Sequence, residues 1–262
     1  MPVKCWKWLD FGGPRMGWEV FAIGVLAALF AGVSKGGFGS GAAFAGAAIL
    51  ALLVEPGMAL GIMLPLLMLI DVATLRPYWR QWGRGEAWVL ILGGLPGVAL
   101  GVAFYRVADA DLLRLLIGGI ALGFVLWQVL VRSGVIRGAR RALPGWAGML
   151  AGMVAGFTSF VSHAGGPPAA VYLLSRGIDK TRYQATTVIL FFVLNIAKAV
   201  PYAVMGLFTV QTLLIDLALA PFALLGAWIG VRAHRVVPER AFFGITYVLL
   251  AVTGAKLILD VL

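Results

Sequence analysis

The sequence predicts an all-α polytopic membrane protein: an inverted repeat of two halves with about eight long transmembrane helices and two short broken or re-entrant helices. Composition is the first observation, because 61% of residues are hydrophobic, only 12% are charged and the mean hydropathy is +0.98, far from the balance of a soluble domain. The other two observations are the lengths of the apolar runs and a sequence repeat that relates the two halves.

Eight apolar runs are long enough to cross the ~30 Å hydrocarbon core, which takes about 20 helical residues. They are residues 18–34, 58–75, 87–105, 112–131, 146–162, 183–205, 210–231 and 241–262. Two further runs, 42–54 and 167–175, reach only about 20 Å and 14 Å at ~1.5 Å per residue. Each directly follows a glycine-rich break, which predicts a discontinuous helix of the kind found in transporters.

The two halves match when the chain is shifted by 124 residues. The shift places Ala31-Gly32 on Ala155-Gly156, Asp71-Val72-Ala73 on Asn195-Ile196-Ala197, and Pro77-Tyr78 on Pro201-Tyr202; one residue more places Pro96 and Gly101 on Pro221 and Gly226. One register held over such a stretch indicates a duplication. The predicted organisation is an N-terminal tail (1–17), a first transmembrane repeat (18–131), a basic cytoplasmic linker (132–145) and a second transmembrane repeat (146–262).

Equivalent loops of the two halves carry opposite charge bias. The loop after the short segment is "VEPG" in the first half and "SRGIDKTR" in the second, whereas the loop after Pro-Tyr is basic in the first half and "MGLFTV" in the second. Since basic loops stay in the cytoplasm, the halves are expected to insert upside down to one another. The net charge of +10 is therefore explained by basic cytoplasmic loops that follow the positive-inside rule, rather than by binding to nucleic acid. Both termini are then extracytoplasmic, although the tail itself carries three basic residues, which does not fit.

The glycine-rich breaks predict a site for a small anion near the middle of the membrane. Irregular backbone at that depth must face protein or a water-filled cavity, and exposed N–H groups at helix starts favour negative charge. Lys198 lies far from either end of its span, and a centred lysine costs ~2.5–3.5 kcal/mol on insertion scales. Asp71 is predicted to carry the coupled proton or to act as counter-ion to a lysine, so Asp71→Asn is expected to weaken pH dependence more than affinity. The predicted substrate-binding residues are Ser34, Lys35, Gly36, Gly37, Thr158, Ser159, Ser162, His163, Gly165, Gly166, Asn195 and Lys198.

Structural roles for the same residues stay open at this point. Lys35 is also placed to snorkel to the headgroups, and Asp71 with Lys198 is also suited to a buried structural pair. The glycines also suit close helix packing, because Gly37 and Gly41 have a small-xxx-small spacing. His163 is equally suited to a structural role, with its ring hydrogen-bonded inside the protein, and to contact with the ligand. Asp216 is expected near the interface, at the start of its span.

Three motifs carry a resemblance to a known family. The segment "AGVSKGGFGSGAAFAGAAIL", its repeat "AGFTSFVSHAGGPPAAVYLL" and the segment "NIAKAVPY" resemble the TauE/SafE sulfite-exporter family, over nearly the whole chain from about residue 18. The resemblance implies a multi-pass transporter of the bacterial inner membrane that exports sulfite, sulfoacetate or related organosulfur anions, coupled to the proton gradient. It does not choose among these substrates.

Other functional classes of membrane protein agree less well with these residues, except for a passive anion channel. An intramembrane serine protease needs a histidine that can serve a serine, and of the two histidines, His163 directly follows Ser162 and His234 lies in a basic loop. A metal transporter needs clusters of His, Cys, Met or carboxylate in its spans. We therefore expect no enzyme, no metal, no cofactor and no nucleic-acid partner, with a small anion, protons and the lipid bilayer as partners and an undetermined oligomeric state. A passive anion channel remains the alternative, because the same donors suit a pore.

Overall fold

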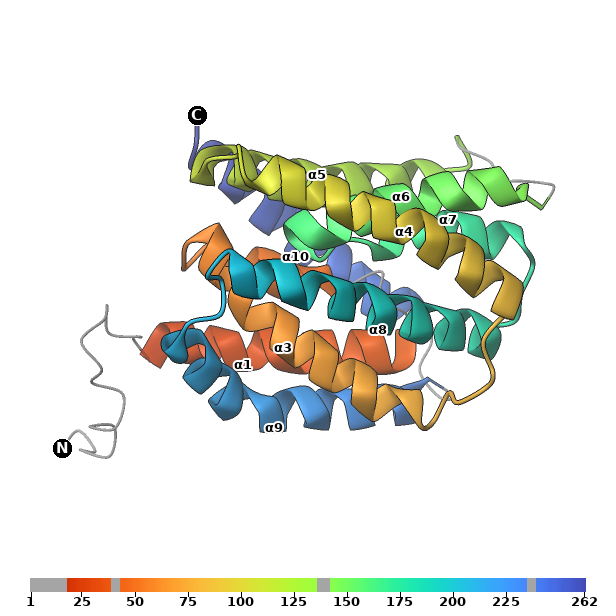
Figure 1. Ribbon diagram of the computed structural model, residues 1–262, viewed down its shortest axis with the longest axis horizontal. Helices are drawn as coiled ribbons and strands as arrows, with labels where there is room; N and C mark the ends of the chain where they lie inside the picture. Colours follow the sequence, from red (N-terminus) through yellow and green to blue (C-terminus); the bar gives the residue numbers. More distant parts are fainter. Residues whose placement is uncertain (1–17, 39–42, 136–141, 235–238) are drawn as a thin grey trace.

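The computed structural model describes residues 18–38, 43–135, 142–234 and 239–262, and these residues form helices joined by short turns. In chain order the elements are α1 (Trp18–Val33), the π-helical segment η2 (Ser34–Phe38), α2 (Phe44–Leu50), α3 (Pro56–Leu75), α4 (Arg84–Tyr105), α5 (Ala110–Arg132), α6 (Gly145–Ser162), α7 (Gly166–Ser175), α8 (Lys180–Val204), α9 (Val210–Ala233) and α10 (Glu239–Leu259). Figure 1 shows them packed side by side along one direction.

The all-α membrane fold is confirmed. Seven of the predicted spans are helices long and apolar enough to cross a membrane, the first of them made by α1 together with η2. The eighth, 241–262, corresponds to α10, in which the apolar stretch Thr246–Leu259 is shorter. The two short predicted segments are the short helices α2 and α7. The N-terminal tail 1–17 and residues 136–141 of the basic linker lie outside the described residues.

The helices pack in a twofold pattern. The most extensive contact between the halves joins α4 to α6, and the equivalent contact joins α9 to α1. The packing of α3 on α9 likewise has its counterpart in the packing of α8 on α4. In addition, α3 packs on α8 and α5 packs on α10, so each of these helices contacts its own equivalent in the other half. Figure 1 shows α1 and α6 running in opposite directions, and α3 and α8 likewise. This is the arrangement expected of an inverted repeat; the exact repeat boundaries stay a prediction.

Glycines allow the two equivalent helix pairs to approach closely. A Cβ on Gly32 or Gly36 would come within 2.4–2.5 Å of a backbone oxygen of α9, and a Cβ on Gly156 would overlap the carbonyl oxygen of Gly94 in α4. The small-xxx-small spacing is therefore used by Gly32 and Gly36 against α9, while Gly41 lies outside the described residues. Van der Waals contact at these positions holds the halves together where lipid supplies no hydrophobic driving force.

We expect Gly97→Val to disrupt the packing of α4 on α6. A Cβ there would overlap the carbonyl oxygen of Met153, which is backbone and cannot rotate away, so the substitution costs at least about 1–3 kcal/mol. The control is Gly123→Val on α5, where a Cβ meets open space. The apparent melting temperature in detergent should fall for Gly97→Val and stay within about 2 °C of wild type for Gly123→Val. Equal melting temperatures for the two variants would show that the contact between α4 and α6 is not tightly packed.

Candidate functional site: a polar cluster at the twofold axis

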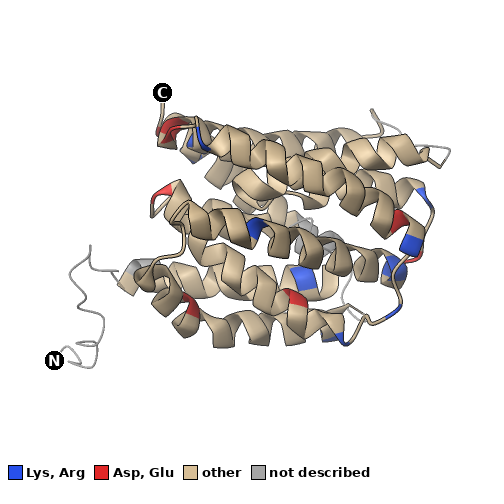
Figure 2. Ribbon diagram, in the orientation of Figure 1, with Lys and Arg blue, Asp and Glu red and all other residues tan. Residues whose placement is uncertain are grey.

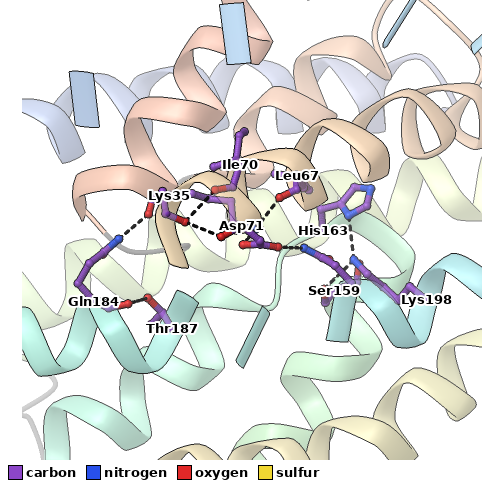
Figure 3. Close-up of polar contacts among 11 residues, drawn as sticks. Lys35, Leu67, Ile70, Asp71, Ser159, His163, Gln184, Thr187 and Lys198 are labelled. Atoms are coloured by element: carbon purple, nitrogen blue, oxygen red, sulfur yellow. Dashed lines mark hydrogen bonds and ion pairs between the residues drawn. The ribbon is translucent and has the colours of Figure 1, made fainter. Parts of the chain in front are cut away.

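Two groups of polar side chains lie next to one another between η2, α3, α6 and α8 (Figure 3), and together they form one polar cluster around a small cavity. Lys35 Nζ of η2 forms an ion pair with Asp71 Oδ1 of α3 at 2.5 Å, and both side chains are buried. Asn195 Nδ2 of α8 donates to the other oxygen, Asp71 Oδ2, at 2.6 Å. Lys35 also lies 3.5 Å from the carbonyl oxygen of Leu67 and 5.9 Å from the centre of the Phe191 ring. Both oxygens of Asp71 are therefore engaged by groups from two different helices.

The cluster lies on the twofold axis that relates the halves. Asp71 and Asn195 occupy equivalent positions in the 124-residue register, and a residue can touch its own equivalent only at such an axis. Two tyrosines repeat the same symmetry nearby: the Tyr78 hydroxyl donates to the carbonyl of Gly36 at 2.7 Å, and the Tyr202 hydroxyl donates to that of Phe160 at 2.5 Å. These tyrosines belong to the Pro-Tyr motifs, and each fixes the backbone of a helix that carries site residues.

Lys198 is fully buried and its ammonium group makes three hydrogen bonds to neutral acceptors. Its Nζ lies 3.0 Å from the carbonyl oxygen of Ser159, 3.0 Å from Ser159 Oγ and 3.0 Å from His163 Nδ1. His163 Nε2 lies 3.3 Å from the carbonyl oxygen of Leu60. Because a carbonyl only accepts, Nε2 carries the ring proton and Nδ1 is left to accept from Lys198. The histidine is thus neutral here, and Lys198 contacts no carboxylate among the described residues.

A small cavity lies in the middle of the cluster. Its volume is ≈ 10 Å³, about the space that one water occupies. Five predicted site residues line it together with three apolar side chains that the sequence did not single out. The eight lining residues are Lys35, Ser159, His163, Asn195, Lys198, Ala43, Leu67 and Phe191. Two ammonium groups and one carboxylate leave one positive charge in excess, so the site favours an anion.

The local sequence explains how each break is built. In the second half, α6 ends at Ser162 and His163 adopts a left-handed conformation with φ 56°, which reverses the chain into α7. Pro167 and Pro168 begin α7 as predicted, but proline lacks an N–H, so this helix start offers fewer donors than the sequence suggested. In the first half the helix does not break at once, because η2 continues it for another turn and carries Lys35.

The remaining predicted residues do not line the small cavity. Gly36 and Gly37 pack against the backbone of α9, and a Cβ on Gly165 would lie 2.6 Å from the carbonyl oxygen of Ala155. The hydroxyls of Thr158 and Ser162 donate to backbone oxygens of α6 at 2.8 and 2.9 Å. Ser34 and Gly166 are buried in the same two breaks. These residues shape the breaks, and their contact with substrate stays a prediction.

A second, larger cavity of ≈ 420 Å³ lies next to the cluster, with Arg132, Lys180 and Gln184 in its wall. Gln184 joins the wall of this cavity to the polar cluster, because its side-chain amide donates to the carbonyl oxygen of Lys35 while its own oxygen is buried without a hydrogen-bond partner. Gln184 and the tyrosines were missed as site residues. The repeated Pro-Tyr motif was a usable signal for the tyrosines, whereas nothing in the sequence marks Gln184.

Comparison with protein families assigns the chain. The model of the family described as "Sulfite exporter TauE/SafE" matches residues 24–257. The chain belongs to the TauE/SafE family. No curated protein and no solved structure matches it. As a TauE/SafE protein it belongs to a family of sulfur-anion export transporters, and the multi-pass membrane assignment is confirmed.

The described residues of this TauE/SafE protein contain no group of three or more His, Cys, Asp or Glu that could hold a metal ion. The small cavity is lined by two ammonium groups, those of Lys35 and Lys198.

Proposed function

We propose that this protein is a secondary transporter that exports sulfite or a small organosulfonate such as sulfoacetate in exchange for protons, by alternating access at the cavity between Lys35 and Lys198. The observation that carries the proposal is a fully buried ammonium, Lys198, held only by neutral acceptors beside a cavity on the twofold axis. A charge kept in the membrane at this cost marks a substrate pathway by default.

The hydrogen bonds of Lys198 suit the replacement of neutral partners by an anion. Sulfite and sulfonates present three oxygens, each an acceptor, and a charge-assisted hydrogen bond is about twice as strong as a neutral one. The Ser159 hydroxyl and the second N–H of Asn195 Nδ2 add donors around the same point. The cavity in this conformation is too small for such an anion, so binding must be accompanied by separation of the elements that enclose it.

The twofold arrangement supports alternating access. In inverted-repeat transporters the site lies at the interface of the repeats, and the two repeats exchange conformations as the site opens to either side. Here Asp71 and Asn195, which are equivalent residues, meet at the axis beside the cavity. The Lys35–Asp71 pair lies on the first half and Lys198 with His163 on the second, so movement of one half against the other changes the enclosure of the anion.

The larger cavity is suited to be the entrance from the cytoplasm. Most of the Lys and Arg residues in Figure 2 lie at one end of the bundle, where α3 ends and α8 begins, and such residues stay cytoplasmic. Arg132 and Lys180 place positive charge in the wall of this cavity, which raises the local concentration of an anionic substrate. Gln184, bound to the backbone of Lys35, then separates the entrance from the site.

Transport by purified protein in liposomes tests the proposal. A panel of sulfite, thiosulfate, sulfate, sulfoacetate and taurine is first screened by thermal shift, because a ligand of the folded state raises apparent stability. Uptake of the best ligand is then measured with an acidic lumen and with the membrane potential held at zero by potassium and valinomycin. Exchange of the anion for protons predicts accumulation in the acidic lumen above the external concentration.

Each alternative gives a different result. A passive channel at zero potential equilibrates the anion without accumulation, and symport with protons concentrates it in an alkaline lumen instead. Sulfoacetate is the better probe of the two proposed substrates, because the sulfonate is ionised throughout this pH range and does not cross lipid as a neutral acid. Failure of every anion in the panel to bind or move contradicts the proposed substrate class.

A further inference from the structure

A second carboxyl group is buried in the membrane part of the protein, away from the cluster. Asp216 of α9 is 6% exposed. Both of its carboxyl oxygens are buried without a hydrogen-bond partner, and within the described residues it forms no ion pair. Asp71, by contrast, is bound by Lys35 and Asn195. Asp216 can therefore gain or lose a proton without breaking an ion pair.

Within the part of the chain that the structure describes, the elements with the main contacts to α9 supply no cation to Asp216. These elements are α1, η2 and α3. The ionisable residues in them are Glu19 of α1, whose side chain lies outside the described part, Lys35 of η2 and Asp71 of α3, and the last two pair with one another. Glu55, which precedes α3, is exposed. An ionised carboxylate buried without partners is costly, so Asp216 holds a proton in this conformation.

The repeat indicates that the carboxyl group is not needed for packing. In the register that places Pro96 on Pro221, the residue equivalent to Asp216 is Ile91 of α4, and it is also buried, at 8% exposed. The fold therefore accepts an apolar side chain at this position in the other half. A residue that costs stability, fulfils no packing requirement and lies in a transporter span is a candidate for function.

Asp216 and Asp71 lie at different depths. Figure 1 shows α3 and α9 starting at the same end of the bundle. Asp216 comes six residues after the first residue of α9, or about 9 Å along the helix, whereas Asp71 comes fifteen residues after the first residue of α3, or about 22 Å. Because α3 packs on α9, the two carboxyls lie nearer to opposite ends of one helix pair.

We propose that Asp216 is a proton-binding site of the transport cycle, taking up a proton from the end of the bundle where α9 begins and releasing it when the halves exchange conformations. This inference rests on the proposed function. The proton binds to the carboxylate and leaves from the same oxygen, so no other reactant is needed. Asp216 positions no substrate; it supplies the protonation step that makes movement of the anion depend on the proton gradient.

Asp216→Asn separates coupling from transport. The amide is isosteric with the protonated acid but cannot release a proton. We expect the variant to lose accumulation of sulfoacetate in an acidic lumen while it keeps counterflow, the exchange of labelled for unlabelled anion at equal pH, within about threefold of wild type. Asp111→Asn is the matched control, since Asp111 is 64% exposed and lies at the start of α5, and it should change neither assay.

Several results overturn the inference. If Asp216→Asn accumulates the anion as wild type does, Asp216 has no role in coupling. If the variant loses both counterflow and accumulation, Asp216 is a general structural requirement instead. As a measurement that does not depend on the variant folding, wild-type protein is treated with dicyclohexylcarbodiimide, which modifies protonated carboxyls in the membrane. We expect modification of Asp216 that declines as pH rises; its absence at every pH contradicts a proton there. A wild type that transports nothing contradicts the proposed function, whereas the modification still tests the proton site.

Discussion

Lys198→Met is expected to weaken ligand binding strongly while leaving the substrate-free protein at least as stable as wild type. The ammonium is fully buried and contacts only neutral acceptors, so its removal relieves a desolvation cost. A bound anion loses its charged partner, which costs at least about 2 kcal/mol and so raises the Kd at least about 30-fold. Apparent melting temperatures with and without sulfite or sulfoacetate measure both effects together.

Lys256→Met is the matched control for this prediction. Lys256 is 58% exposed and pairs with Asp260 one helical turn away, so its loss should leave both stability and ligand response unchanged. A structural role for Lys198 predicts the opposite of the expected pattern, with a large fall in melting temperature and an unchanged ligand-induced shift. Stability and binding that move in opposite directions are typical of functional residues.

Much of the site could be predicted because its main elements repeat. The 124-residue register made Asp71 and Asn195 equivalent, and equivalence is the reason they meet at an axis. Lys198 stood out because a lysine in the middle of an apolar span is costly. These inferences depend on composition and spacing, which the sequence contains in full.

The partners of the charges could not be predicted in the same way. The sequence allowed a pair between Asp71 and Lys198, but the structure pairs Asp71 with Lys35, because the helix continues through η2 and carries Lys35 towards α3. The π-helical turn packs closely on α9 through Gly36 and Gly37, and such a tertiary contact cannot be read from the sequence of the turn alone. The burial of Asp216 likewise depends on which helices cover α9.

The Lys35–Asp71 ion pair gives the largest expected effect on stability. Asp71→Asn leaves the buried ammonium of Lys35 without a carboxylate, and Lys35→Met leaves the buried carboxylate without an ammonium. Breaking one side of a buried pair typically costs about 3–5 kcal/mol. We expect both single variants to show a marked fall in apparent melting temperature, and the double variant Lys35→Met/Asp71→Asn to recover most of it, because no isolated charge remains.

The double variant also decides what Lys35 is for. If Lys35 serves only to neutralise Asp71, the double variant binds the anion with wild-type affinity, because Lys198 still faces the cavity. If Lys35 also holds the anion, as its place in the cavity wall indicates, the double variant is stable but binds at least about 30-fold more weakly, from the loss of about 2 kcal/mol. Single-variant losses that simply add in the double variant would show that the two charges are not coupled. Asp260→Asn, in the exposed pair with Lys256, is the reference for an ion pair worth less than about 1 kcal/mol.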